Sequence, residues 1–276
     1  MKTPLHWRAL ELAVLLIALA IMLFPIYWMV NTALKPASEV FQTPPSFFSA
    51  NWSLDAFRSL FESRPIGRYF LNSFIVAGGT TLLSLVLASL AAYGLTRFPI
   101  RIEGLVILAL LFVKMLPEAL LVVPFYQLVA DMRLLNSYLA LVLVYSSFAL
   151  PFAVWMLIGF FRVIPSELDE AGIMDGATRL QTFRLVVLPL ARPGIVAVAM
   201  FTFLTAWNAY LWALVLTTDP DMYVLPVGIA TMKGEYQVQW NELMAAAVVA
   251  VVPVLAIYSV LERHLVAGIT AGAVKG

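Results

Sequence analysis

The sequence predicts an all-α membrane protein with six transmembrane helices, built as one domain over residues 1–276. Hydrophobic residues make up 62% of the chain and charged residues only 12%, and the mean hydropathy is +0.93. A soluble domain is nearer half apolar and a quarter charged. A membrane-spanning helix needs about 20 apolar residues, and six runs reach that length. They lie near residues 10–31, 69–93, 104–128, 138–161, 193–216 and 242–262.

The first of these runs is expected to be an uncleaved span. Its apolar stretch is longer than the core of a signal peptide, and no small-x-small cleavage site follows it. Most runs also carry prolines, which membrane helices tolerate as kinks, often where helices bend around a pathway. The prolines that interrupt the runs are Pro25, Pro117, Pro124, Pro151 and Pro253.

The distribution of Lys and Arg predicts that both termini are cytoplasmic, because short cytoplasmic loops carry an excess of positive residues. With six spans, a cytoplasmic N-terminus also places the connection between spans four and five in the cytoplasm. The segments that then lie inside hold Lys2, Arg8, Arg97, Arg101, Arg162, Arg179, Arg184, Arg192, Arg263 and Lys275. The segments outside hold fewer, namely Lys35, Arg58, Arg64, Arg68, Arg133 and Lys233.

Composition and motifs argue against several kinds of function. The net charge of +1 creates no basic field for nucleic acid, and a chain without cysteine has no disulfide, thiol catalysis or cysteine metal site. His6 and His264 lie near membrane edges and are interpreted as interfacial residues. No GxxxxGK[ST] phosphate loop and no cluster of Asp, Glu and His occurs. We therefore expect no catalytic residue, no metal site and no cofactor on this chain, and no enzyme activity of its own.

Residues 170–193 form a polar, arginine-bearing segment in an otherwise apolar chain. They read EAGIMDGATRLQTFRLVVLPLARP. A capping box, which starts a helix, pairs Ser or Thr with an acidic or amide residue three positions later. Ser166 with Asp169 fits this pattern, and so does Thr178 with Gln181.

These signals predict two short helices joined by a tight turn. The first helix is expected near 167–174 and the second near 179–187. Gly176 lies between them and suits the left-handed conformation that ends a helix. Three apolar residues are expected to share one face of the second helix, namely Leu180, Phe183 and Val187.

This segment resembles the EAA loop of ABC-importer permeases. The family pattern is EAA, three residues, Gly, nine residues, Ile, one residue and Leu-Pro, and the matching residues are Glu170, Ala171, Gly176, Leu188 and Pro189. Gly172 replaces the second Ala, at a cost to the helix of about 1 kcal/mol, and Val186 stands where Ile is usual. In the family this loop docks an ATPase subunit. The resemblance implies that role for Glu170, Ala171, Gly172, Asp175, Gly176 and Ala177.

Polar side chains inside the spans are candidates for a translocation pathway, because such groups are costly in lipid and tend to be functional. Lys114 and Glu118 are four residues apart and share a helix face. They either pair with each other, which is favoured, or line a water-filled route. The fifth span reads FTFLTAWNAYLW, which suits either a sugar surface or helix contacts with an aromatic belt. We assign Asn208 to the pathway and Trp212 to the belt, with further pathway candidates Thr205, Trp207 and Tyr210.

Two segments expected on the outer side, 35–68 and 217–241, are rich in aromatic and turn residues. In the first, Ser53 can cap a short helix that carries Leu54, Phe57 and Phe61. The segments are either a platform for an external partner or interface loops whose Trp and Tyr fix the depth in the membrane. Both roles stay open.

The C-terminal tail, 265–276, ends in GITAGAVKG, a Gly-rich stretch that on its own predicts disorder. It resembles the C-terminus of permeases in the carbohydrate-uptake group of ABC importers, particularly the smaller permease of maltose-type systems. With the spans, the EAA loop 165–193 and the WN pair of the fifth span, the resemblance covers essentially the whole chain. It implies the type I ABC importer permease fold, with cytoplasmic EAA coupling helices between spans four and five.

The same resemblance implies a function. It indicates a permease subunit of an ATP-driven, binding-protein-dependent importer of sugar or sugar-like solutes, which forms half of the translocation pathway in the cell (inner) membrane of a prokaryote. The implied partners are a second permease subunit in a heterodimer, an ATPase dimer that carries ATP and Mg, an extracytoplasmic solute-binding protein and the lipid bilayer, with no nucleic acid. Two alternatives stay open: an ion-coupled secondary transporter, and a non-transporting membrane scaffold or receptor subunit.

Overall fold

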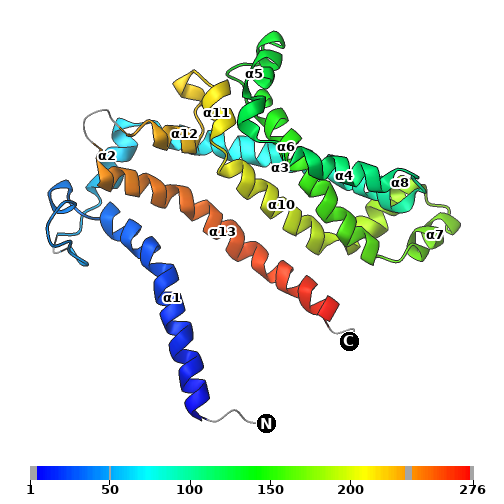
Figure 1. Ribbon diagram of the computed structural model, residues 1–276, viewed down its shortest axis with the longest axis horizontal. Helices are drawn as coiled ribbons and strands as arrows, with labels where there is room; N and C mark the ends of the chain where they lie inside the picture. The colour runs from blue at the N-terminus through cyan, green and yellow to red at the C-terminus, as the bar shows by residue number, and fades with distance from the viewer. Residues whose placement is uncertain (1–4, 50, 234–237, 274–276) are drawn as a thin grey trace. The chain divides into compact units, whose positions relative to one another are not determined.

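The computed structural model describes residues 5–49, 51–233 and 238–273, and the regular structure in these ranges is entirely helical (Figure 1). Within them, four helices are long and apolar enough to cross a membrane, or up to six spans if each of two bent helix pairs counts as one. The expected all-α class is confirmed. The chain divides into two compact units, Met1–Gly67 with Ile229–Val252, and Arg68–Gly228 with Pro253–Gly276.

The first unit contains α1 (Leu5–Ala33), η1 (Ala37–Glu39), α2 (Asp55–Ser63) and the beginning of α13 (Trp240–Ala273). Most apolar side chains of α1 are exposed, as expected of a helix that faces lipid or a partner chain. The predicted short helix after Ser53 is α2, and the Ser53 hydroxyl accepts a hydrogen bond from the N–H of Asp55 (2.9 Å). Ser59 on α2 donates to Glu242 on α13 (2.6 Å), which ties α2 to the beginning of the last long helix.

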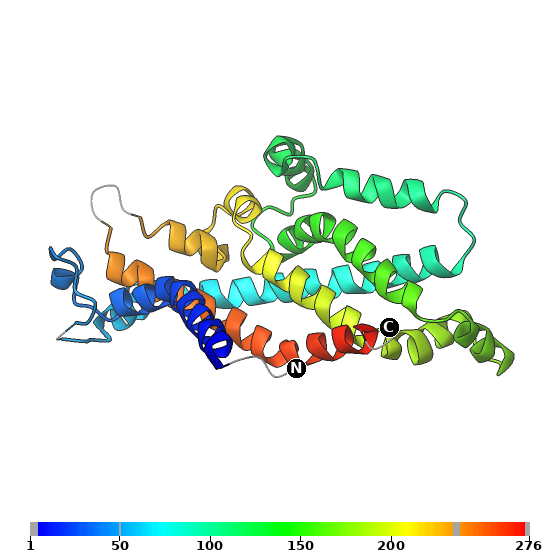
Figure 2. The ribbon, with the colours of Figure 1, turned by 60° about the horizontal axis from the view of Figure 1, so that its bottom comes forward.

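The second unit contains the remaining helices, in the order α3 (Ile66–Arg97), α4 (Glu103–Val113), η2 (Glu118–Leu121), α5 (Val122–Asp131), α6 (Tyr138–Val163), α7 (Glu167–Met174), α8 (Arg179–Thr182), the π-helix η3 (Phe183–Val187), α9 (Leu188–Leu190), α10 (Arg192–Trp207), α11 (Leu211–Leu216), η4 (Pro220–Met222) and α12 (Leu225–Ala230). Its apolar core forms where α3, α6 and α10 lie side by side (Figure 2). Gly194 at the start of α10 permits this approach, because a Cβ there would lie 2.3 Å from Cγ of Phe160 on α6. Small residues commonly let membrane helices pack closely in this way.

Four of the six predicted spans correspond to single long helices. The runs 10–31, 69–93, 138–161 and 242–262 lie within α1, α3, α6 and α13. Helix α13 continues to Ala273, so most of the tail expected to be irregular is helical, and only its last three residues lie outside the described part of the chain.

The other two predicted spans, 104–128 and 193–216, are not single helices. Helix α4 ends at Val113, and the chain bends by 89° before η2 and α5. Pro117 lies in this bend with extended backbone, and a proline has no N–H with which to continue a helix. In the fifth run, α10 ends at Trp207 and α11 begins at Leu211. Asn208 therefore lies at a helix end and not in the middle of a span.

Hydrogen bonds order the loop after α11 at one end of the second unit. The Asn72 amide donates to the carbonyls of Asp221 (2.9 Å) and Tyr223 (2.8 Å) and accepts from the Tyr138 hydroxyl (2.6 Å). The amide oxygen of Asn136 accepts from two further N–H groups of the loop. The loop is thus a fixed surface on the second unit, whichever role it has at the membrane.

The close packing of α6 and α10 gives a first test. Gly194→Ala is expected to lower the free energy of unfolding by about 1–3 kcal/mol, because the added methyl group overpacks the contact with Phe160. The matched control is Gly159→Ala on α6, where a Cβ meets nothing within 4 Å. The control is expected to be neutral or stabilising, since Ala favours helix over Gly by about 1 kcal/mol. The measurement is thermal unfolding of the two purified variants in detergent. Equal melting temperatures would contradict the close contact between Gly194 and Phe160.

Candidate functional site

Helix α7 and the turn that follows it form as the sequence predicts. The helix spans Glu167–Met174, and Gly176 has a φ of +87°. The N–H of Gly176 donates to the carbonyl of Ile173 (3.0 Å), and that of Ala177 donates to Gly172 (3.0 Å). These two bonds define a Schellman motif, which satisfies the last carbonyls of the helix and needs a left-handed residue at its centre. The left-handed turn predicted at Gly176 is confirmed.

Only one of the two predicted capping boxes is present. At the start of α8 the Thr178 hydroxyl accepts from the N–H of Gln181 (3.3 Å), and the Gln181 side chain accepts from the N–H of Thr178 (2.7 Å). The box predicted at Ser166 and Asp169 is wrong. Ser166 has helical backbone and makes no side-chain cap, and the Asp169 carboxylate is bound by Arg97 instead.

The second predicted helix is α-helical for only four residues. Helix α8 ends at Thr182, and the next five residues form the π-helix. We attribute the wider turn to Pro189, which has no N–H for the carbonyl of Leu185 and whose ring crowds that carbonyl. Phe183 and Val187 are buried as expected, but Leu180 is 65% exposed. The prediction that Leu180 shares their face is therefore wrong.

The glycine that departs from the EAA pattern lies where α7 meets α8. A Cβ on Gly172 would be 3.0 Å from Oγ1 and 3.1 Å from Cγ2 of Thr182. Thr182 is buried and its hydroxyl donates to the carbonyl of Thr178 (3.2 Å), so it has little room to move. The replacement of Ala by Gly at this position thus accommodates the threonine on the facing helix.

The α7–α8 hairpin presents an exposed surface with apolar and charged groups. Of the implied docking residues, Glu170, Ala171, Asp175 and Gly176 are exposed, and Gly172 and Ala177 are half-buried. Met174 at the end of α7 is 86% exposed. A shallow hollow of about 330 Å³ beside it is lined by Thr178, Leu180, Gln181, Arg184 and Leu185. Exposed apolar side chains gathered at a polar rim are typical of a protein interaction site.

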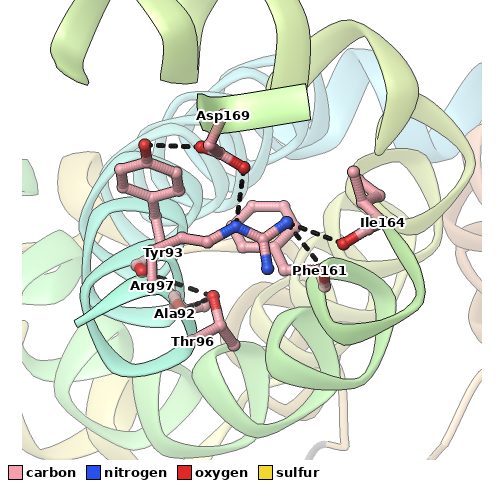
Figure 3. A network of polar contacts seen from close by, with 7 residues as sticks. All are labelled: Ala92, Tyr93, Thr96, Arg97, Phe161, Ile164 and Asp169. Atoms are coloured by element: carbon pink, nitrogen blue, oxygen red, sulfur yellow. Dashed lines mark hydrogen bonds and ion pairs between the residues drawn. The ribbon is translucent and has the colours of Figure 1, made fainter. Parts of the chain in front are cut away.

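Behind this surface a buried ion pair attaches α7 to the long helices (Figure 3). Arg97 Nε donates to Asp169 Oδ2 (2.8 Å), and the Tyr93 hydroxyl donates to Asp169 Oδ1 (2.8 Å). Arg97 Nη2 also donates to the carbonyls of Ile164 (2.8 Å) and Phe161 (3.3 Å). The side chains of Arg97 and Asp169 are only 7% and 8% exposed. Removing one partner of such a pair costs about 3–5 kcal/mol, because it leaves a buried charge unpaired.

A second polar site is a small cavity, of about 40 Å³, in the second unit beside the break between α4 and η2. It is lined by Thr80, Glu118, Tyr145, Phe148, Ala149, Thr205, Ala206, Ala209 and Trp212. The indole N–H of Trp212 donates to Glu118 Oε2 (3.1 Å). The Thr80 hydroxyl is buried and has no hydrogen-bond partner. A space of this size holds one or two water molecules where polar groups converge.

The structure brings two of the six pathway candidates, Glu118 and Thr205, to this cavity. Lys114 lies in the bend after α4. Among the described residues it forms no direct salt bridge with Glu118, but the two charges still attract each other at longer range. Trp207 is buried against Phe203 and Phe70. The Asn208 amide donates to a carbonyl of its own helix (2.8 Å), and Tyr210 is exposed.

Sequence reasoning missed three residues of these two sites. Trp212, which was assigned to an aromatic belt, is buried and stacks with Phe148 at 5.1 Å between ring centroids. Tyr93 and Arg97 were not singled out, although their spacing of four residues at the end of an apolar run places both on one helix face. In the described part of the chain, no group of three or more His, Cys, Asp or Glu residues is placed to hold a metal ion.

The Trp212–Glu118 hydrogen bond gives a second test. Trp212→Phe keeps an aromatic ring against Phe148 but removes the only donor that reaches Glu118 among the described residues. It is expected to lower stability by about 1 kcal/mol or more, because a hydrogen bond is lost and the smaller ring leaves space around a fully buried position. Trp155→Phe, at an exposed position on α6, is the control and should change stability little. The comparison is made by thermal unfolding in detergent, and an equal effect of both changes would show that the bond contributes nothing.

Comparison with known proteins assigns the chain to a family. A family model described as "Binding-protein-dependent transport system inner membrane component" matches residues 8–271. The chain is 34% identical over 270 residues to a diacetylchitobiose uptake system permease protein of Streptomyces coelicolor, a match that covers 98% of this chain and 97% of the relative. It is 35% identical over 273 residues to a trehalose transport system permease protein of Mycobacterium tuberculosis, covering 98% and 97%.

A solved structure extends the comparison to the fold. A chain from a bacterial ABC transporter involved in the import of the acidic polysaccharide alginate superposes with a TM-score of 0.82 over 95% of this chain and 98% of that one. The two sequences are 21% identical, so this match shows a common fold. Together with the family match over nearly the whole chain, it confirms the expected resemblance. The chain belongs to the family of binding-protein-dependent transport system inner membrane components.

Proposed function

We propose that this chain is a permease subunit of an ATP-driven importer and that its α7–α8 hairpin docks the ATPase. The observation that carries the proposal is the hairpin itself, a Schellman turn at Gly176 between two short helices that expose Met174, Leu180 and Glu170. An exposed apolar tip on a rigid, charged hairpin is suited to a protein cleft. The spacing of the EAA pattern within the hairpin supports the ATPase as the partner.

The solute is proposed to be a sugar or a sugar-like molecule. Relatives named for diacetylchitobiose and trehalose uptake, and one named for sulfoquinovosyl glycerol in Agrobacterium fabrum that is 35% identical over 254 residues, support this class. The assembly would contain a second permease subunit, two ATPase subunits that bind ATP and Mg, and an extracytoplasmic solute-binding protein. It would lie in the inner membrane of a prokaryote, with both termini of this chain in the cytoplasm.

The proposed mechanism is alternating access. Closure of the ATPase pair on ATP moves the docked α7, and the helices attached to α7 re-pack to open the pathway to the outside. Hydrolysis then restores the inward-open state. To convert a 1:99 population into 99:1, ATP must favour one state by about 5.5 kcal/mol. The hairpin must therefore transmit force without bending.

Among the pathway candidates, we propose that Glu118 and Thr205 contribute polar groups to the route, because both line the cavity beside the broken span. Asn208 and Tyr210 are exposed at the junction of α10 and α11, which suits contact with a passing solute. Lys114 is exposed in the bend after α4, where the positive charge can face water. Trp207 is proposed to support the route from the core, since its ring is buried.

An ion-coupled transporter is the second candidate function. Such a mechanism needs a relay of ionisable groups inside the membrane, and the cavity holds a single carboxylate, Glu118, among its lining residues. A scaffold without transport would need no hairpin of fixed geometry. Uptake into vesicles that depends on ATP and on a co-expressed ATPase separates the three functions.

The turn at Gly176 gives the sharpest test of the proposed function. Gly176→Val is expected to abolish uptake, because a β-branched residue at a φ of +87° costs about 1–2 kcal/mol or more and redirects α7. Membrane levels should stay near wild type, since the spanning helices are unchanged, while the ATPase is lost from the membrane. Gly176→Ala should be milder. Membrane fractions probed for both chains give the result, and normal uptake with the ATPase bound to Gly176→Val would overturn the docking proposal.

A further inference from the structure

One guanidinium group joins three helices behind the α7–α8 hairpin (Figure 3). Arg97 is the last residue of α3, and it donates to Asp169 on α7 and to the carbonyls of Phe161 and Ile164 at the end of α6. The last carbonyls of a helix have no partner within the helix. Arg97 therefore caps α6 and pairs with α7 in the same geometry.

The connection from α6 to α7 is short, and α7 packs against α8 and the π-helix as well as binding Arg97. Only Ile164, Pro165 and Ser166 separate the two helices, and Ser166 makes no side-chain cap. The Asp169 carboxylate uses both oxygens, one for Arg97 and one for the hydroxyl of Tyr93. The buried polar contacts of α7 thus run to the end of α3.

The second arm of the hairpin contacts the same end of α3. The ring of Phe183 lies 4.8 Å from that of Tyr93, between centroids, and the guanidinium of Arg179 lies 5.0 Å from the Phe98 ring centre. Both arms are thereby attached to one helix end, and the buried hydrogen bonds between α3 and α7 are made by Tyr93, Arg97 and Asp169.

We propose that Tyr93, Arg97 and Asp169 are positioning residues that make α7 a rigid extension of α3 and α6, so that a movement of the docked hairpin reaches both helices together. The inference rests on the proposed function, since it describes how the docking hairpin passes on its motion. Apolar residues could fill this buried space with equal or better stability. The planar guanidinium of Arg97 donates to two carbonyls at the end of α6 and to the Asp169 carboxylate, so it fixes the direction of α7 relative to α6. Apolar packing alone would not fix that direction.

The first experiment measures the rigidity of α7 in the full-length chain. The sequence has no cysteine, so nitroxide labels attach only to cysteines that are introduced. The labelled positions are Met174→Cys on α7 and Leu82→Cys on α3, where both native side chains are exposed. In lipid nanodiscs, the distance distribution between the labels is expected to be narrow. Asp169→Asn should broaden it, because the ion pair is lost while the shape of the side chain is kept. An unchanged distribution would overturn the proposal.

The matched control is Glu103→Gln. Glu103 forms an ion pair with Arg162 at the end of α6, and no hydrogen bond or ion pair joins it to α7 in the described part of the chain. This change removes a carboxylate charge near the same helix end and should leave the distribution narrow. Equal broadening by both variants would assign the effect to general loosening and would also overturn the proposal.

The second experiment measures coupling in the complex assembled with the ATPase and binding protein. Asp169→Asn is expected to keep the ATPase bound and to reduce the stimulation of ATP hydrolysis by the binding protein about fivefold or more. Arg97→Lys should fall between this variant and wild type, since an ammonium group cannot reach the carboxylate and both carbonyls in a fixed plane. Tyr93→Phe should be the mildest and keeps the test open if a charge change prevents folding.

The outcomes separate the two proposals. If the wild-type chain does not retain an ATPase, the proposed function fails. The width of the distance distribution between the two labels still tests the rigidity of α7, because it is measured on the chain without partners. If the ATPase is retained and stimulation is unchanged in all three variants, the positioning role fails while the proposed function stands.

Discussion

The arrangement of the second unit around the α7–α8 hairpin depends on the buried positive charge of Arg97. An arginine side chain remains protonated under all physiological conditions, and Arg97 is nearly buried at the end of an apolar helix. Such a group must find acceptors or unfold its surroundings. The Arg97 guanidinium has three acceptors, which are the Asp169 carboxylate on α7 and the carbonyls of Phe161 and Ile164 at the end of α6. The end of α6, the start of α7 and the side chain of Tyr93 are all placed by that requirement, and the exposed face of the hairpin follows from it.

The same constraint explains how the break between α4 and η2 is tolerated. In lipid, non-helical backbone persists only where protein or water satisfies its polar groups. Here the chain bends at Pro117, and the carboxylate that follows accepts the indole N–H of Trp212 from α11. The aromatic rings of Phe125 and Phe148 surround that indole. The bend is therefore held by side chains that are distant in sequence.

Local signals in the sequence predicted the elements that depend on local chemistry. The bounds of α7, the left-handed Gly176 and the capping box at Thr178 follow from residue types and spacing within a few positions. The long helices follow from runs of apolar residues. Ser166 and Asp169 have the same local pattern as a cap, but the carboxylate is bound more strongly by a charge 72 positions away. No pattern within a short window contains that competitor.

Residues at the two sites were harder to predict for the same reason. Lys114 and Glu118 share a face only on a continuous helix, and Pro117 removes that helix. Trp212 has the composition of an interfacial aromatic, yet its surroundings come from α5 and α6. The family resemblance identified the hairpin, whereas the attachment of the hairpin to α3 emerged only from the tertiary structure.

The π-helix at Phe183–Val187 limits which insertions and deletions the chain can tolerate at this point. An α-helix turns by about 100° for each residue, so the wider turn changes the angular phase between the hairpin and α10. In this phase Phe183 and Val187 are buried in the core. Loss or gain of one residue here would rotate every later side chain of the fifth span away from its neighbours. During evolution this stretch should accept many exchanges of residue type but hardly any insertion or deletion.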